Sequence, residues 1–255
     1  MVALYRGHKL GMLPPRKGSL LCARAPRAST LVTPVPVLPD AVDLALRWYI
    51  EPRNQGAEGS CTGHSTAAFR ELLWATAHGE HLADRLAPAY SYARTRIAEG
   101  SWPRDAGATI ADEMAVLEAF GVCREASMPY TADPAEPVPE AADVEAQQFR
   151  IGEPAIVDLG NVDSARQVLA AGLPINLAIP VYSSFGDVSA DGTVPVPDTE
   201  RETLEGGHGV CIAGYDVGRK AWLIVNSWGL DFANGGLAWL PWAHPYWESW
   251  TAAAC

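Results

Sequence analysis

The stretch Gln55-Gly56-Ala57-Glu58-Gly59-Ser60-Cys61 guides the interpretation of this 255-residue chain, because it places a thiol directly before a helix-forming run. Residues 62–78 are rich in Ala and Leu, and Gly79 follows them as a helix stop signal. A cysteine in the first turn of a helix lies near unpaired backbone N–H groups and the positive end of the helix dipole. Both favour the thiolate, so we predict a lowered pKa for Cys61 and a nucleophilic role.

A later part of the chain supplies a base and an orienting group. Residues 210–225 read as two apolar strands joined by a polar turn, which is typical of an antiparallel hairpin. His208 precedes the first strand and Asn226 follows the second, so both fall at the same end of the sheet. The Asn226 side-chain oxygen would orient the His208 ring and leave its other nitrogen to exchange a proton with Cys61. Trp228 would shield that contact from water.

Three segments of the sequence, which contain Cys61, His208 and Asn226, resemble those of the papain-like cysteine peptidases. In that family a glutamine lies six residues before the cysteine, the histidine begins a glycine-flanked strand, and Asn-Ser-Trp-Gly follows. The same order is present here in residues 54–61, 207–210 and 226–229. The histidine and asparagine follow the cysteine by 147 and 165 residues, near the family spacing of roughly 130 to 150. The resemblance covers about residues 40–245.

The resemblance implies a cysteine-type endopeptidase with a Cys61-His208-Asn226 triad. Cys61 would attack the peptide carbonyl, His208 would protonate the leaving amine, and water would then hydrolyse the thioester acyl-enzyme. The Gln55 side chain and the Cys61 backbone N–H would form the oxyanion hole. Two alternatives stay open: a transferase or isopeptidase on the same triad, and a peptide-binding relative without turnover. The residues expected to contact a peptide or protein substrate are Gly107, Gly207 and Trp228.

Three residues depart from the usual family pattern. Glu58 stands where the family has a disulfide-forming cysteine, so the chain is more similar to the disulfide-free bacterial and viral members. Thr62 replaces the aromatic residue after the nucleophile without removing a catalytic atom. His64 lies one helical turn after Cys61, where an apolar residue is usual, and we expect it to bond to backbone or water rather than to act as the base.

Cysteine usage indicates a thiol protein without a disulfide framework, since the number is odd and the spacing unpaired. Cys123 and Cys211 stand in apolar runs and are expected to be inert core residues. Cys211 follows His208 by three residues, but the chain has no CxxC or HxxxH companion that zinc would need. We therefore expect no metal and no cofactor. The five cysteines are Cys22, Cys61, Cys123, Cys211 and Cys255.

Hydrophobic periodicity predicts an α+β protein with two lobes. Before residue 150 the apolar runs are helical, as in residues 106–120. After it they are short and β-branched, as in residues 156–159 and 175–179, with one helix at residues 161–171. The resemblance implies the same papain-like arrangement, with the active site in the cleft between a helical N-terminal lobe and an antiparallel, β-barrel-like C-terminal lobe.

The sequence divides into three predicted regions. Residues 1–39 form a basic arm rich in Pro and Gly, residues 40–145 a mainly helical lobe that carries the nucleophile, and residues 146–255 a β-rich lobe that carries the histidine and asparagine. Residues 131–145 contain three prolines and several acidic residues, and are predicted to link the lobes.

The arm differs in charge from the rest of the chain. It holds six Lys or Arg residues and no acid. Because the whole chain holds 19 basic and 30 acidic residues, the remainder holds 13 and 30, a net charge of −17. Three interpretations stay open: a disordered tail, an arm packed along the acidic body, and a short autoinhibitory or removable segment. We favour the packed arm.

Charge and hydropathy also exclude some partners. An acidic body argues against nucleic acid. Arg6, His8 and Lys9 interrupt the apolar core that a secretory signal requires, and no apolar run reaches transmembrane length. We therefore expect a cytoplasmic monomer with neither nucleic-acid nor membrane partners.

Overall fold

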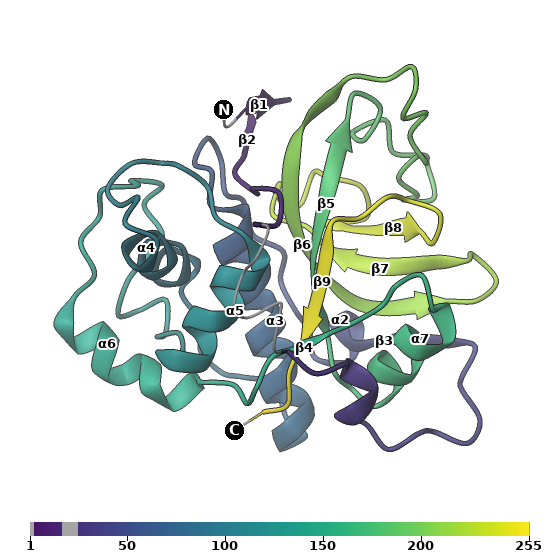
Figure 1. Ribbon diagram of the computed structural model, residues 1–255, viewed down its shortest axis with the longest axis horizontal. Helices are drawn as coiled ribbons and strands as arrows, with labels where there is room; N and C mark the ends of the chain where they lie inside the picture. Colours follow the sequence, from purple (N-terminus) through teal and green to yellow (C-terminus); the bar gives the residue numbers. More distant parts are fainter. Residues whose placement is uncertain (1–2, 17–24, 255) are drawn as a thin grey trace.

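The protein has a helical side and a sheet side in a computed structural model that describes residues 3–16 and 25–254 (Figure 1). Helices α3 to α6 gather on one side, whereas α2 and α7 lie with the sheet on the other. None of the helices in the described residues is long and apolar enough to cross a bilayer. The helices are α2 (Leu44–Arg47), α3 (Cys61–His78), α4 (Pro88–Ala98), α5 (Ile110–Ala119), α6 (Glu140–Ala146) and α7 (Val162–Ala170), with the 3-10 helices η1 (Ala28–Thr30) and η2 (Gln147–Phe149).

The sheet is antiparallel and follows the strand order β4-β9-β5-β6-β7-β8, with β3 paired to β6. A separate hairpin, β1-β2, belongs to the N-terminal arm. The strands are β1 (Ala3–Tyr5), β2 (His8–Leu10), β3 (Ala41–Asp43), β4 (Ala155–Ile156), β5 (Ile175–Tyr182), β6 (Leu204–Asp216), β7 (Ala221–Val225), β8 (Leu237–Pro241) and β9 (Glu248–Thr251).

Helix α3 lies at the boundary between the two sides. It packs against α4 on the helical side and against β6 of the sheet. Apolar side chains such as Phe69 and Leu72 are fully buried in the larger of two hydrophobic clusters. The helix ends as predicted at Gly79, which has a φ of 73° and donates its N–H to the Ala75 oxygen at 2.9 Å. Burial on both sides fixes the position of its first residue, Cys61.

The hairpin predicted at residues 210–225 and the helix predicted at residues 106–120 are both present, with adjusted bounds. Residues 210–225 lie in β6 and β7, which pair with Cys211 opposite Val225. The helix predicted from residue 106 begins at Ile110, because the Thr109 hydroxyl accepts a hydrogen bond from the Asp112 N–H at 3.1 Å and caps it. Residues 106–109 therefore belong to the loop before the helix.

Two assignments along the chain differ from the structure. Residues 131–145, predicted as a linker, include most of helix α6, which begins after Pro139 and buries Ala142 in the core. Residues 41–43, predicted to belong to the helical lobe, form β3 and pair with β6. Acidic residues in the first turn of α6 stabilise the helix through their interaction with the positive end of its dipole. The prolines of residues 131–139 therefore precede a helix rather than replace one.

Candidate active site

Cys61 is the first residue of α3, and its side chain is fully buried. Strand β6 runs against this helix terminus. A Cβ atom on Gly209 would lie 3.2 Å from the Cys61 backbone oxygen and 3.1 Å from the Ser65 hydroxyl, so only glycine lets the strand come this close without displacing its neighbours. The close approach brings His208, the residue before Gly209, next to the helix that begins with Cys61.

His208 and Asn226 meet as the hairpin register requires. The His208 Nε2 donates to the Asn226 Oδ1 at 2.6 Å, and both side chains are buried. Because an amide oxygen only accepts, Nε2 carries the proton and Nδ1 keeps a lone pair. The Trp228 ring lies 4.7 Å from the His208 ring between centroids and is itself nearly buried. The pair is therefore shielded from water and held in one tautomer.

Gln55 is tied to the same block of sequence. Its backbone N–H donates to the Ser227 oxygen at 2.8 Å, and its Oε1 accepts from the Ser227 hydroxyl at 2.7 Å. This contact joins the loop before Cys61 to the segment after β7. The Gln55 Nε2 donates to the backbone oxygens of Glu58 at 2.9 Å and Lys9 at 2.8 Å. The second of these partners belongs to the N-terminal arm.

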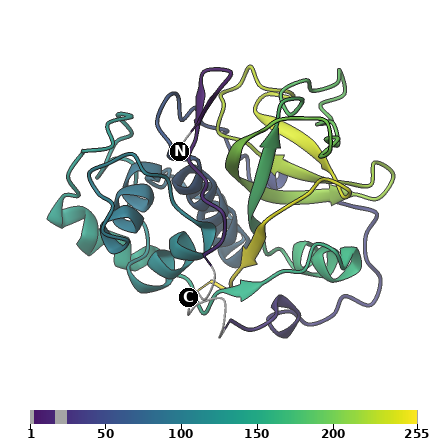
Figure 2. The same cartoon turned by 45° about the horizontal axis from the view of Figure 1, so that its top comes forward.

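The arm lies between the two sides and crosses the site (Figure 2). The Gly11 oxygen accepts from the Ala108 N–H at 3.0 Å, and the Leu13 N–H donates to the Ala108 oxygen at 2.8 Å. On the other side the Met12 N–H donates to the Gly207 oxygen at 3.2 Å. The arm therefore pairs with both lobes through its backbone and covers Cys61.

The residues expected to contact substrate all contact the arm. A Cβ on Gly107, which has a φ of 78°, would lie 2.2 Å from the Gly11 oxygen. A Cβ on Gly207 would lie 2.4 Å from the Met12 oxygen and overlap Trp247. The Trp228 ring stacks on the His8 ring at 5.2 Å and 7°. The arm therefore occupies the surfaces that are predicted from the sequence to contact a peptide substrate.

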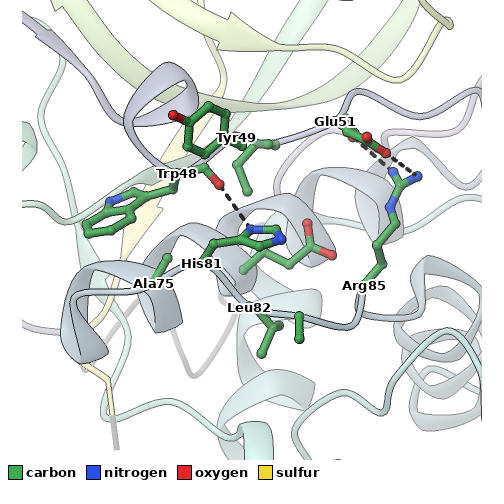
Figure 3. Close-up of a pocket in the computed structure, with 10 residues that line it drawn as sticks. Trp48, Tyr49, Glu51, Ala75, His81, Leu82 and Arg85 are labelled. Atoms are coloured by element: carbon green, nitrogen blue, oxygen red, sulfur yellow. Dashed lines mark hydrogen bonds and ion pairs between the residues drawn. The ribbon is translucent and has the colours of Figure 1, made fainter.

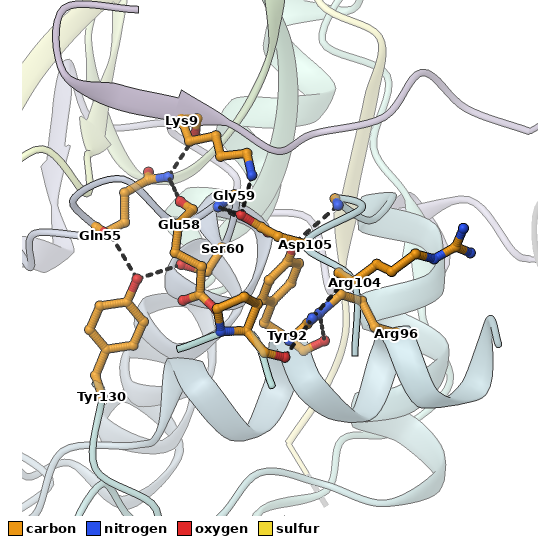
Figure 4. Close-up of polar contacts among 12 residues, drawn as sticks. Lys9, Gln55, Glu58, Gly59, Ser60, Tyr92, Arg96, Arg104, Asp105 and Tyr130 are labelled. Atoms are coloured by element: carbon orange, nitrogen blue, oxygen red, sulfur yellow. Dashed lines mark hydrogen bonds and ion pairs between the residues drawn. The ribbon is translucent and has the colours of Figure 1, made fainter. Parts of the chain in front are cut away.

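Asp105 anchors the arm to the loop before Cys61 (Figure 4). Its carboxylate accepts hydrogen bonds from the Lys9 ammonium, the Tyr92 hydroxyl and, at 3.0 Å, the Gly59 N–H. Burial of Asp105 opposes ionisation, but these hydrogen bonds outweigh it and lower its pKa. No local pattern in the sequence indicates this network, since Lys9 and Asp105 are 96 residues apart.

The predicted lowering of the Cys61 pKa is wrong for this arrangement. Burial raises the pKa of Cys61 to about 11, although backbone N–H groups of Gly209, Gly11, Thr62 and Met12 favour the thiolate. Burial also lowers the pKa of His208 to about 4, against the hydrogen bond to Asn226 that favours the imidazolium. Desolvation penalises both charged forms. With the arm in place the pair is therefore a neutral thiol and a neutral imidazole.

Hydrogen bonds hold the loop before Cys61 at the position where the family disulfide is missing. The Tyr130 hydroxyl donates to the Gln55 backbone oxygen at 2.7 Å and lies 2.8 Å from the Ser60 hydroxyl (Figure 4). The residue after Cys61 is also held in place, because the Thr62 hydroxyl donates to the Glu113 carboxylate at 2.9 Å. The sequence marks Glu58 and Thr62 as departures but does not reveal these partners.

The two other cysteines among the described residues belong to the hydrophobic core. Cys123 and Cys211 are free and buried, and burial raises the pKa of both. Cys22 and Cys255 lie outside the described residues. Within residues 3–16 and 25–254, no group of three or more His, Cys, Asp or Glu side chains could hold a metal ion.

A separate pocket of about 330 Å³ lies away from the triad (Figure 3). Two polar contacts lie on its wall. The His81 Nδ1 lies 3.2 Å from the Trp48 backbone oxygen, and Arg85 forms an ion pair with Glu51. None of the residues predicted for catalysis lines this pocket. The predicted cleft is not open, because the arm fills it.

Comparison with known proteins adds the family. The sequence-family model described as "Papain family cysteine protease" matches residues 38–241 of this chain. The chain belongs to the papain family of cysteine proteases. An uncharacterized peptidase C1-like protein of Acanthamoeba polyphaga mimivirus is 27% identical over 207 residues, covering 75% of this chain and 64% of that protein. Mouse cathepsin K is 26% identical over 204 residues, covering 79% and 59%.

Solved structures of papain-family proteins share the fold. Xylellain, a cysteine protease from Xylella fastidiosa, has a TM-score of 0.82 and 27% identity, covering 99% of this chain and 98% of that chain. A Carica candamarcensis cysteine protease has a TM-score of 0.66 and 19% identity, covering 85% and 99%, which supports the fold alone. The predicted two-lobed α+β fold and the likeness to bacterial and viral members are confirmed. This chain spans less than two thirds of the length of the mimivirus and mouse relatives.

Proposed function

We propose that this chain is a cysteine-type endopeptidase that cleaves peptide bonds through a Cys61-His208-Asn226 triad. The observation that carries the proposal is the buried 2.6 Å bond from His208 Nε2 to Asn226 Oδ1, beside the helix terminus that presents Cys61. A base held in one tautomer next to a thiol at a helix N-terminus is the arrangement that activates a cysteine nucleophile.

Each residue then has a defined role. The His208 Nδ1 takes the thiol proton of Cys61, and the sulfur attacks the scissile carbonyl. The His208 imidazolium protonates the departing amine, and a water molecule activated by the same ring hydrolyses the thioester. The Gln55 Nε2 and the Cys61 backbone N–H stabilise the tetrahedral oxyanion. Asn226 keeps the His208 ring oriented throughout.

The arm has to leave for this reaction to occur. It covers Cys61, and the Lys9 carbonyl accepts the hydrogen bond that Gln55 would offer to an oxyanion. Departure would also admit water to the cleft, which reduces the desolvation that now keeps Cys61 and His208 neutral. The conformation with the arm bound is therefore a self-inhibited one.

Covalent labelling tests the proposal. The full chain is treated with an epoxide or fluoromethyl ketone cysteine probe and mapped by mass spectrometry. We expect label on Cys61, loss of that label in His208→Ala, and unchanged labelling in Cys123→Ala, which removes a buried thiol outside the site. Label distributed over other cysteines, or none in folded protein under conditions that release the arm, would contradict the triad.

Product analysis separates peptide hydrolysis from the alternatives. Incubation of a peptide library with an added amine acceptor should yield hydrolysed fragments with free carboxyl ends. Products joined to the amine would instead identify a transferase. Labelling of Cys61 without any cleavage would favour a peptide-binding relative.

A further inference from the structure

A small cavity borders the catalytic asparagine. It measures about 10 Å³, and His64, Gly209 and Asn226 are among the residues of its wall. A single bound water needs about 10–15 Å³. The side chains of His64 and Asn226 belong to residues only 3% and 2% exposed, so neither depends on bulk solvent for hydrogen bonds.

Nitrogen atoms without partners belong to residues of this wall. Within the described part of the chain, three of them make no hydrogen bond: His64 Nε2, Asn226 Nδ2 and Arg53 Nε. Buried polar atoms in folded proteins nearly always have a partner, and an ordered water supplies it where protein groups do not. Three such atoms on residues that line one water-sized space are best explained by a common partner.

The hydrogen-bond type of His64 follows from its other nitrogen. His64 Nδ1 lies 2.9 Å from the Ser60 backbone oxygen, which only accepts, so Nδ1 carries a proton. Burial lowers the pKa of His64 to about 3, and the ring is neutral. Its Nε2 is consequently an acceptor.

Asn226 presents the complementary group. Its Oδ1 accepts from His208 Nε2 at 2.6 Å and from the Ser227 N–H at 2.8 Å. Its amide nitrogen therefore has N–H donors and no acceptor. The Arg53 Nε is likewise a donor, while the rest of that guanidinium is held by Glu71 at 2.6 Å. Two donors and one acceptor match the bonding capacity of one water.

We propose that one water molecule in this cavity accepts from Asn226 Nδ2 and donates to His64 Nε2, which makes His64 a positioning residue for the triad. This proposal rests on the function proposed above. Rotation of the Asn226 amide by a half turn would set its NH₂ against both His208 Nε2–H and the Ser227 N–H, so these two donors select the amide orientation. By accepting from the water, His64 holds in place the partner of the Asn226 amide nitrogen, which limits movement of the amide that keeps His208 in the productive tautomer.

Two substitutions separate the halves of the His64 ring. His64→Asn keeps a donor near the Ser60 oxygen but loses the distant acceptor, whereas His64→Gln places an amide oxygen near the position of Nε2. His78 provides the matched control on the same helix, because its Nδ1 makes the equivalent bond to the Trp74 oxygen at 2.8 Å but lies at the exposed end.

Turnover and tautomer are both measured on the full chain. We expect His64→Asn to lower kcat about tenfold or more with KM changed by less than about twofold, and His64→Gln to restore most of kcat. His78→Asn and His78→Gln should match the unmutated chain. Nitrogen NMR of His208 in a Cys61→Ala background should show the Nε2–H tautomer, with a mixture of tautomers appearing only in His64→Asn.

The outcomes distinguish this inference from the proposed function. Equal kcat and equal His208 nitrogen shifts in His64→Asn and His64→Gln would overturn the role of His64. An unmutated chain that fails to cleave peptides under any arm-releasing condition would overturn the proposed function, while the NMR comparison would still decide the inference. A high-resolution crystal structure gives a test without variants: water density between His64 Nε2 and Asn226 Nδ2 supports the proposal, and a side chain or direct contact there contradicts it.

Discussion

The Gln55 Nε2 donates a hydrogen bond to the Lys9 backbone oxygen at 2.8 Å. A side-chain N–H suited to an oxyanion is thus occupied by a carbonyl of the same chain. The next arm residues continue the contact by pairing with Ala108 and Gly207 on opposite walls. Cys61 is fully buried with the arm in this position, so access to its thiol requires the arm to move.

Gly11 is a position at which the arm has no room for a side chain. A Cβ there would lie 1.7 Å from the Gly59 backbone oxygen, a separation that no side chain tolerates without backbone movement. We expect Gly11→Val to displace the arm and to raise the rate of Cys61 alkylation on the order of tenfold, because that rate scales with the population of the open form. The rate of probe incorporation, followed by mass spectrometry, measures it.

The control for this substitution is Leu4→Ala, which removes an exposed side chain from the same arm. Its alkylation rate should equal that of the unmutated chain. Equal rates in Gly11→Val and the unmutated chain would show that the arm does not limit access to the thiol.

Gln55 should contribute to the rate of the chemical step. Gln55→Glu keeps the shape and the oxygen that accepts from Ser227, but replaces the oxyanion donor by a carboxylate oxygen. Loss of one such donor typically lowers kcat by about 10² to 10³, and we expect KM to change much less. Steady-state kinetics with a peptide substrate measure both.

Gln167→Glu is the matched control, because this glutamine also bonds to the N-terminal arm but through Val35, and not beside Cys61. An equal loss of kcat in both variants would mean that the effect comes from the arm rather than from the oxyanion hole.

The sequence was sufficient for those parts of the site that depend on local pattern. The turn between β6 and β7 sets the register, and the register alone brings His208 and Asn226 to one end of the sheet. The helix stop at Gly79 and the helix start at Cys61 likewise follow from neighbouring residues. In each case the determining interactions lie within one hairpin or one helix.

The remaining features depend on contacts between distant residues. The path of the arm is set by Lys9 and Gly11 against loops far along the chain, and strands of three residues carry too little pattern to predict it. The pKa of Cys61 does not follow from the sequence, because a helix terminus is visible there, whereas the burial that outweighs it is not. Helix α6 was missed because three prolines precede it, although Pro139 serves as its N-cap.

Tyr130 should stabilise the nucleophile loop in place of the absent disulfide. Its hydroxyl bridges the Gln55 backbone oxygen and the Ser60 hydroxyl, and Tyr130→Phe leaves both with one partner fewer. We expect a loss of about 1–3 kcal/mol in the free energy of unfolding, measured by urea denaturation. Tyr246→Phe, at a partly exposed tyrosine, should change stability by less than about 0.5 kcal/mol. A similar loss in both variants would count against the bridge.

Glu113 on α5 links helices α3 and α4 close to Cys61. Its carboxyl is fully buried and accepts hydrogen bonds from the Thr62 hydroxyl on α3 and the Ser91 hydroxyl on α4. Burial raises its pKa from 4.5 to about 7, despite these hydrogen bonds that favour the ionised form. Between those two pH values the folded chain holds a proton that the unfolded chain has lost, so Glu113 stabilises the fold below pH 4.5 and this contribution is lost as pH rises through 7.

Glu113→Gln removes this dependence while preserving the shape of the side chain. The melting temperature of the variant relative to the unmutated chain should rise as pH increases from 4.5 to 7 and then level off. One pKa unit corresponds to about 1.4 kcal/mol, so the free energy of unfolding of the variant relative to the unmutated chain should change by about 3 kcal/mol over this pH range. Glu200→Gln, at an exposed carboxylate, should follow the unmutated chain at every pH. A difference for Glu113→Gln that stays constant, or falls as pH rises, would mean that Glu113 is ionised in the folded protein.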